Sequence, residues 1–571
     1  MKRHGRSFGS ILLALATASA SACSTPASTP DAAAETFDTG LDTGELVDAY
    51  VRPDVYRPPR DTGLDAPNPR LPFCDPSAPA PGPYPAPGAF PAPHGPGLGT
   101  VDTSLHPVGT NCAFLDGGEM DTADHHNLAV MVDGYLLLPW APETGRGGLT
   151  FFDVSDPCAP TIVGNSYSTT MRETHTVGFY EREGHRYAVV DQMTRVAHGG
   201  GIQFWDITDP TSPQVVADLE LPHFLYPDSY ARPTLSVSWQ GPYVFVGAAD
   251  TGVHVVDAVD PAHPAWVTTI TIDPVLRVGM VQTIGNLLIA TAAEGPRTAL
   301  FDISDPENPQ PIPGGEFSAI DDTGEARDSY FSTTAGGYVF YARKEMGGGV
   351  IAMDIHDPTR PAYAADVRDD GNGGYVYVHE GHILVGESNL ARVYDVSDLF
   401  DADPERVIPS TPEVELDLMG DLDFAVPLGQ MAILSVDEHA DPDRGSALVP
   451  WQSARDTTAP VENWVYPPPM GDALYENVPA GSRFGVSFSE MIQVESAWEG
   501  SVRLYRADAA SPDEGRVAGF VSAQEHIVQF VPACPLEPGV EYVLEMPTGG
   551  LHDVSGNALA STITHHFRVT P

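Results

Sequence analysis

Short apolar runs separated by glycine turns recur between residues 122 and 455. Examples are LAVMVDGYLLLPW at 128–140, LSVSWQGPYVFVG at 235–247 and VYVHEGHILVGE at 376–387. Each segment is typical of two short strands joined by a tight turn, because short apolar runs bounded by turn residues indicate strands. No sustained helical period appears in this region. The pattern therefore predicts an all-β fold.

A second half of the unit follows each glycine turn and ends in an aspartate, often continuing as x-[ST]-D-P-x-x-P. Copies lie at 151–160, 204–213, 255–264, 300–309, 352–361 and, in degenerate form, 393–404. The lead aspartates, which recur every 41 to 53 residues, are Asp153, Asp206, Asp257, Asp302, Asp354 and Asp395. A seventh, eroded copy at 447–460 has Gln452 in place of the aspartate.

The proline-containing segment explains how each unit turns. Proline cannot donate to a strand ladder, so it should end the third strand, while the aspartate before it accepts hydrogen bonds from turn amides. One four-stranded unit cannot bury both faces of its sheet alone, whereas units in a ring pack against two neighbours. Seven units predict a seven-bladed β-propeller over residues 111–455. The repeat resembles the LVIVD family of bacterial and archaeal surface propellers, a resemblance that supplies no catalytic residues.

The last segment, residues 456–571, has a different pattern. It contains GVSFSEMI at 485–492, VQFVPACPLEPGVEYVLEM at 528–546 and GGLHDVSGNALA at 549–560. About 110 residues with roughly seven short strands suit a β-sandwich. The order of these motifs resembles a bacterial Ig-like domain of the SbsA type, which implies a spacer or adhesion module.

The N-terminus is typical of an export signal. Basic residues precede an apolar stretch at 11–18, which is too short to span a membrane and therefore predicts a signal peptide over 1–22. Small residues directly before Cys23 resemble a bacterial lipobox, which implies lipidation of Cys23 and, with Ser24 after it, an outer-membrane destination. Cleavage near Ala22 and release of a free protein is the alternative. Residues 23–110 are rich in Asp, Pro and Ala, so we expect a disordered tether.

Composition narrows the set of partners. With 29 Lys and Arg against 78 Asp and Glu, the net charge of −49 disfavours nucleic acid and anionic lipid surfaces. In an exported chain, four further cysteines are expected to form disulfides rather than a metal site. They are Cys74, Cys112, Cys158 and Cys534, and the sequence leaves all three pairings open, including Cys74 with Cys112.

Catalytic motifs are weak. The triplet Asp-Thr-Gly, which two-domain aspartic proteases use, starts at Asp38, Asp42, Asp61, Asp250 and Asp322. Three copies fall in the predicted tether, and the one at Asp250 falls in a strand turn, so we interpret them as turn chemistry. No G-x-S-x-G elbow is present, and the stretch His379-Glu380-Gly381-His382 lies in a predicted hairpin turn rather than on one face of a helix.

Calcium binding is a further hypothesis, because calcium takes six to eight oxygen ligands from acidic loops. The acidic clusters are Asp366, Asp369, Asp370 and Asn372, then Asp437, Glu438, Asp441 and Asp443, and also Asp321 with Asp322. None matches an EF-hand loop, so solvated acidic loops are the simpler interpretation. The sequence predicts no cofactor beyond this structural calcium.

Alignment of the seven glycine turns places one group of polar residues near the starts of the innermost strands. They are His126, His175, Arg232, Arg277, Asp328 and Asp421. In a propeller these starts ring one mouth of the central channel, which is a usual ligand site.

These features predict a lipid-anchored protein of the outer membrane or cell surface that acts as a non-catalytic binding or adhesion scaffold. Its expected partner is a protein or a polysaccharide, and nucleic acid is not expected. The alternative is an extracellular propeller hydrolase or lyase, which would need convergent acid and base groups at the channel mouth. Residues scattered away from a common site would weaken that alternative.

Overall fold

The structure is a computed structural model that describes Cys74 and residues 81–121, 125–141, 146–190, 200–222, 234–344, 348–369, 371–401, 406–436, 446–471 and 478–571. These residues are almost entirely strands and turns, with a single-turn helix, α2 (Ser397–Phe400), and a 3-10 turn, η1 (Val494–Ser496). In this part of the chain no helix has the length and apolar character needed to cross a membrane. The predicted all-β class is confirmed.

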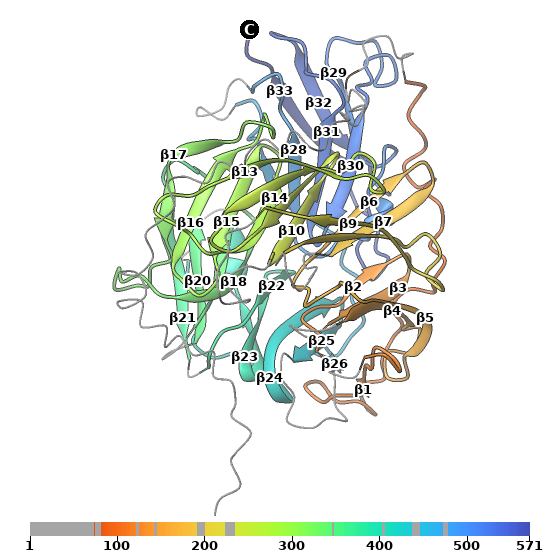
Figure 1. Ribbon diagram of the computed structural model, residues 1–571, viewed down its shortest axis with the longest axis vertical. Helices are drawn as coiled ribbons and strands as arrows, with labels where there is room; N and C mark the ends of the chain where they lie inside the picture. The colour runs from red at the N-terminus through yellow and green to blue at the C-terminus, as the bar shows by residue number, and fades with distance from the viewer. Residues whose placement is uncertain are drawn as a thin grey trace, which may run out of the picture. The chain divides into compact units, whose positions relative to one another are not determined.

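Five successive four-stranded antiparallel sheets form the first five blades (Figure 1). The strands of blades one and two are β2 (Val130–Val132), β3 (Tyr135–Trp140), β4 (Gly147–Asp153), β5 (Thr161–Ser168), β6 (Val177–Arg182), β7 (His185–Val190), β8 (Gly201–Asp206) and β9 (Gln214–Glu220). Those of blades three and four are β10 (Ser236–Gln240), β11 (Tyr243–Gly247), β12 (Val253–Asp257), β13 (Ala265–Ile270), β14 (Val278–Ile284), β15 (Leu287–Ala292), β16 (Arg297–Asp302) and β17 (Gln310–Ser318). Blade five consists of β18 (Ser329–Ala335), β19 (Tyr338–Arg343), β20 (Gly349–Asp354) and β21 (Ala362–Arg368).

The sixth and seventh blades share one continuous ladder. Its strands are β22 (Val376–His379), β23 (His382–Asp395), β24 (Val414–Leu428), β25 (Met431–Val436), β26 (Ala447–Pro450) and β1 (Ala113–Phe114). The first part of β23 pairs with β22, and its second part pairs with the start of β24, whose later part pairs with β25. Each blade thus has four strand positions, and β1 closes the ring by pairing with β26. The seven-bladed propeller is confirmed.

The repeat motif ends the third strand of each blade as predicted. β4, β8, β12, β16, β20 and β23 all end at the lead aspartate. Its carboxylate accepts a hydrogen bond from the amide two residues later, for example 2.8 Å from Ser155 to Asp153 and 2.8 Å from Ser304 to Asp302. The aspartate before the proline does the same, at 3.0 Å from Thr211 to Asp209. The repeat therefore stabilises the turn that follows the third strand.

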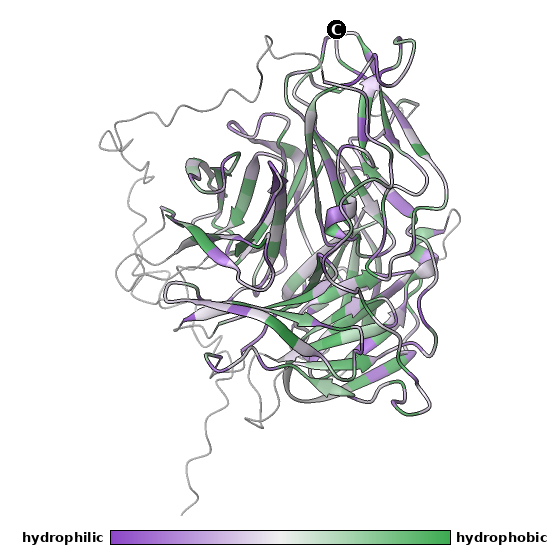
Figure 2. Ribbon diagram, turned by 90° about the vertical axis from the view of Figure 1, so that its right-hand side faces the viewer, coloured by the Kyte–Doolittle hydropathy of each residue, from purple (hydrophilic) through white to green (hydrophobic). Residues whose placement is uncertain are grey.

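The first strands β6, β10, β14, β18 and β22 contact one another in order and so line the ring axis. Apolar residues lie along the strands, as the green ribbon segments in Figure 2 show, and their buried side chains pack between adjacent blades. Phe204 of the second blade, for instance, meets Trp239 of the third edge-on at a centroid distance of 5.4 Å. The core is thus shared between neighbouring blades, and no blade buries its faces alone.

Residues 81–110 pack against the folded domains, so the prediction that the tether extends to residue 110 is wrong for this part. The Arg516 side chain donates to the Gly82 carbonyl at 2.7 Å, and Gly95 and Gly99 donate to the carbonyls of Asp133 and Val154. A proline-rich extended strand has few amides but keeps its carbonyls available to such donors, which the composition did not reveal. Residues 1–73 lie outside the described part.

The C-terminal segment forms two facing sheets with seven strands, as predicted. One sheet has the order β27 (Glu462–Tyr466), β28 (Phe484–Phe488), β31 (Ile527–Pro532) and β30 (Gly519–Gln524). The other consists of β29 (Arg503–Arg506), β32 (Glu541–Met546) and β33 (Ile563–Arg568). Phe484, Phe530 and Phe567 are among the side chains that fill the space between them.

This sandwich packs on the propeller at the turns that join the first and second strands of the blades. Gln529 donates 2.9 Å to the Thr283 carbonyl and accepts 3.0 Å from the Gly285 amide. His526 donates 2.7 Å to the Thr334 carbonyl in blade five, and the Asp133 amide in blade one donates 3.1 Å to Glu495. One end of the channel therefore faces the sandwich.

Candidate functional site

The predicted site lies at the opposite end of the channel. The first strands begin there, because their far ends form the turns against the sandwich. We call this end the distal mouth and define it by the residues that ring it: His125, Asn127, Glu173, His175, Arg277, Glu294 and Lys344.

Glu173 is the centre of one side of the distal mouth. Its Oε1 accepts 2.6 Å from the Asn127 side chain and lies 3.0 Å from Nε2 of His175 and 3.3 Å from Nε2 of His125. Burial alone would raise the pKa of Glu173, but the charge of His175 and hydrogen bonds from both histidines outweigh it and hold that pKa well below its usual range. The carboxylate is thus ionised and fixed by three donors.

Below Glu173 and its three donors, aromatic rings fill the channel. The His175 ring stacks on Phe331 at 5.1 Å, Phe331 on Tyr375 at 4.1 Å, and Tyr375 on Phe424 at 3.4 Å. These rings come from blades two, five, six and seven and are all buried. At this level the channel is a packed core and not a pore.

A second ionic group lies on blades four and five. The Glu294 carboxylate accepts 3.0 Å from Arg277 and 2.8 Å from Lys344, whose ammonium also sits 4.4 Å over the Tyr330 ring. The turns after β13 and after the second strands bring these three side chains together. Glu294 is thus held by two groups of opposite charge, whereas Glu173 is held by an amide and two imidazoles.

The structure brings together only part of the predicted set. His175 and Arg277 line the distal mouth, and Asp328 is exposed beside it, where its carbonyl accepts from the Lys344 amide at 2.9 Å. His126 was wrongly placed: it is buried and bonds Asp121 at 2.6 Å and Ser446 at 3.1 Å. Arg232 and the side chain of Asp421 lie outside the described residues.

The error at His126 has a simple cause. Successive side chains of an extended chain point to opposite sides, so His125 and Asn127 face Glu173 while His126 between them faces blade seven. The predicted register was thus one residue off in blade one. Glu173 itself was missed, although its spacing of two from His175 places both side chains on one side of the chain.

Two of the acidic clusters already have cationic partners. Asp321 accepts 2.6 Å from Arg327 and lies 3.2 Å from Arg368, and Asp369 lies 3.1 Å from Arg392. Their charge is compensated without calcium. Asp370 and the cluster of Asp437, Glu438, Asp441 and Asp443 lie outside the described residues.

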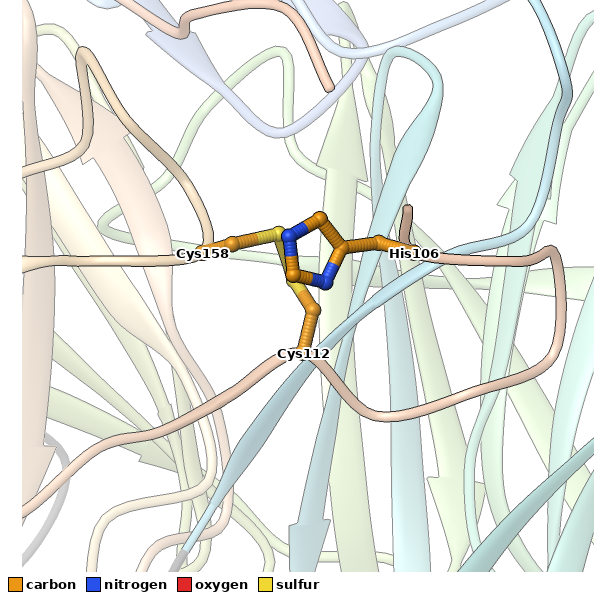
Figure 3. A group of neighbouring side chains, drawn as sticks. All are labelled: His106, Cys112 and Cys158. Atoms are coloured by element: carbon orange, nitrogen blue, oxygen red, sulfur yellow. A yellow bond between two sulfur atoms is a disulfide. The ribbon is translucent and has the colours of Figure 1, made fainter. Parts of the chain in front are cut away.

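The four cysteines form two disulfides, Cys74–Cys534 and Cys112–Cys158. The pairing of Cys74 with Cys112 that the sequence left open does not occur. His106 lies beside the second disulfide, as Figure 3 shows, and the three residues have the spacing of a metal cluster. Because both sulfurs are bonded to each other, neither is the thiolate that a metal needs.

Comparison with known families is consistent with the two folds. Residues 144–169 and 231–271 match the LVIVD repeat, and residues 456–569 match the bacterial Ig-like domain. The chain combines LVIVD repeats with a bacterial Ig-like domain. The resemblances predicted from the motifs are thereby confirmed for both parts, although the matches cover less than half of the chain. No curated protein matches the chain.

Solved structures are similar to this chain only at low identity and with TM-scores below 0.5. A computationally designed protein, Ika8, has a TM-score of 0.38 at 10% identity and covers 60% of this chain and 99% of its own. A chain of the mitotic checkpoint complex has a TM-score of 0.40 at 10% identity, covering 60% and 94%. A putative 6-phosphogluconolactonase from Bacteroides fragilis has 0.38 at 9% identity, covering 52% and 84%. These likenesses are too distant to bear on function.

Proposed function

We propose that this protein is exported, anchored in the outer membrane through a lipid on Cys23, and binds a protein or polysaccharide at the cell surface without transforming it. The binding surface is the distal mouth of the LVIVD propeller. The Ig-like domain serves as a rigid base beneath the ring.

The proposal depends on one observation: the carboxylates of Glu173 and Glu294 at the distal mouth are already held by several donors. Glu173 has three donors and Glu294 has two. A general base must be able to take up a proton near neutral pH, and an ionised carboxylate with a pKa far below its usual range does so poorly. The arrangement supports rigid recognition better than the hydrolase or lyase alternative.

The filled channel supports the same conclusion. A small molecule needs a concave pocket that buries most of its surface, whereas the aromatic stack of His175, Phe331 and Tyr375 closes the channel just below the mouth. A ligand must therefore bind across the rim. Large partners such as a protein or a polysaccharide chain suit that geometry.

The test uses the mature full-length protein immobilised as bait for envelope extracts and for a panel of polysaccharides. We expect specific retention of one partner, and we expect Arg277→Gln to reduce it more than tenfold. Arg297→Gln is the matched control, since Arg297 also pairs with a glutamate in blade four, Glu316, but that partner lies on the outermost strand β17. Retention unchanged by Arg277→Gln, or cleavage of a polysaccharide in the panel, would contradict the proposal.

A further inference from the structure

A buried polar cluster lies where the propeller, the linker and the Ig-like domain meet, far from the distal mouth. His379 ends β22 in blade six, Asp456 begins the linker into the Ig-like domain, and Glu490 follows β28. One ligand atom from each lies within 4.8 Å of the other two. The side chains are 0%, 4% and 0% exposed.

Several atoms in this cluster have no hydrogen-bond partner. Both oxygens of Glu490, both ring nitrogens of His379 and Oδ2 of Asp456 are buried and unpaired among the described residues. An unsatisfied buried polar atom costs about 1–3 kcal/mol, and more if it is charged. Five such atoms at one point indicate that a partner belongs there.

The charge of the cluster is also unbalanced. Asp553 lies beside Glu490, with its two oxygens held by the Asn557 amide at 2.8 Å and the Asn557 side chain at 2.8 Å. No lysine or arginine pairs with Asp456, Glu490 or Asp553 in the part of the chain that the structure describes. These carboxyl groups therefore lie together without a compensating cation among the described residues.

We propose that a divalent transition metal ion of the zinc or manganese type binds here, with His379, Asp456 and Glu490 as its ligands. Neutral imidazole is the form that binds a metal, and neither ring nitrogen of His379 has a hydrogen-bond partner among the described residues. An imidazole among carboxylates suits zinc or manganese, whereas calcium takes oxygen ligands alone. The motifs of the sequence do not reveal this site, because its ligands come from segments more than thirty residues apart.

The ion would have a structural consequence. Tetrahedral zinc ligands lie about 3.4 Å apart, so small side-chain rotations would close the three ligands onto the ion. Because one ligand belongs to the propeller, one to the linker and one to the Ig-like domain, the metal would fix the domain on the ring. The Glu380 amide already donates 2.7 Å to the Ser489 carbonyl beside the site.

The test measures metal content and stability of the full-length mature protein. We expect about one equivalent of zinc or manganese by mass spectrometry, and a melting temperature that falls on chelation and recovers with Zn²⁺ or Mn²⁺ but not with Ca²⁺. Co²⁺ added to the wild-type protein after chelation should give visible absorption bands, and this measurement needs no variant. Absence of binding by all three transition ions would overturn the proposal, as would stabilisation by Ca²⁺ alone.

The variant Glu490→Gln tests whether the change in stability has opposite signs with and without metal. If a metal binds, the variant is less stable than wild type in the presence of Zn²⁺ and binds it more than about tenfold more weakly. In chelator it is more stable than wild type, because the substitution removes a buried carboxyl whose ionised form has no cation beside it. Glu495→Gln is the control, since Glu495 is equally buried at the same interface but bonds Asp133 and Gln493. A Glu490→Gln protein that is more stable than wild type with and without Zn²⁺ would show that the carboxylates share protons instead.

Discussion

The hairpin between β30 and β31 inserts Glu525 into the end of the channel that the Ig-like domain covers. A small cavity there is lined by apolar residues of blades one and two, by Met491 and Val554 of the Ig-like domain, and by Glu525. No group among the described residues donates a hydrogen bond to this carboxyl, and burial raises its pKa to about 7. Glu525→Gln therefore removes a partly buried carboxyl whose ionised form the fold disfavours.

The size and sign of the effect follow from this pKa. A rise from 4.5 to about 7 corresponds to about 3 kcal/mol, at the standard value of about 1.4 kcal/mol per pKa unit. Between these values the folded state binds a proton that the unfolded state has released, so the free energy of unfolding falls as the pH rises. The stabilising protonation is complete below about pH 4.5 and is lost as the pH passes through 7.

Differential scanning calorimetry at pH 5 and pH 8 measures the effect. Glu525→Gln should melt close to wild type at pH 5 and about 3 °C higher at pH 8, given the unfolding entropy of a folded unit of about 500 residues. Glu514→Gln, an exposed glutamate of the same domain, is the control and should shift neither value. Equal melting temperatures of Glu525→Gln and wild type at pH 8 would refute a buried, unpaired carboxyl.

Three further predictions follow from the ring, the interface and the N-terminus. Cys112→Ser should lower the free energy of unfolding by about 4 kcal/mol, since the disulfide closes a loop of 46 residues that joins β1 of blade seven to blade one; an unchanged denaturation midpoint would contradict this role. Gly285→Ala should lower the free energy of unfolding by more than about 2 kcal/mol, because Gly285 has φ +53° and a methyl group would lie 1.9 Å from the Tyr466 carbonyl oxygen. The control Gly324→Ala should cost about 1 kcal/mol, because Gly324 has φ +81° but open space around it. Similar losses of stability in the two glycine variants would show that the interface shifts to make room for the methyl group. Cys23→Ser should abolish incorporation of labelled fatty acid and release the protein from the membrane fraction, and continued labelling would exclude Cys23 as the anchor.

The architecture was predictable because the repeat encodes it locally. Each lead aspartate bonds the amide two residues ahead, so the same letters in the sequence produce the same turn in six blades. The Ig-like strands were predictable for the same reason, since the segment at 485–492 contributes to β28 and the segment at 528–546 contributes to β31 and β32. Interactions between residues close in sequence determine these elements, so their motifs can be found in the sequence alone.

The contacts between distant segments were not predictable. Arg516 donates to the Gly82 carbonyl across more than four hundred residues of sequence, and nothing in the proline-rich stretch predicts this contact. His125 rather than His126 reaches Glu173 because a one-residue difference in register reverses the side of a strand. Such contacts depend on which blades become neighbours around the ring, which the repeat specifies only in order and not in register.

The Ig-like domain changes what the propeller can do. Its Gln529, His526 and Glu495 bond turns of blades four, five and one, so the domain is seated on the ring rather than spaced from it. Each of these bonds uses backbone groups of the blades, and side chains of the blades add further bonds, since Arg483 of the Ig-like domain bonds Asn286 at 2.8 Å and Gln240 at 2.7 Å. One end of the channel is thereby occupied within the same chain. Under the proposed function, recognition by the channel uses the distal mouth, where the side chains of the blades differ from one another and could therefore specify one partner.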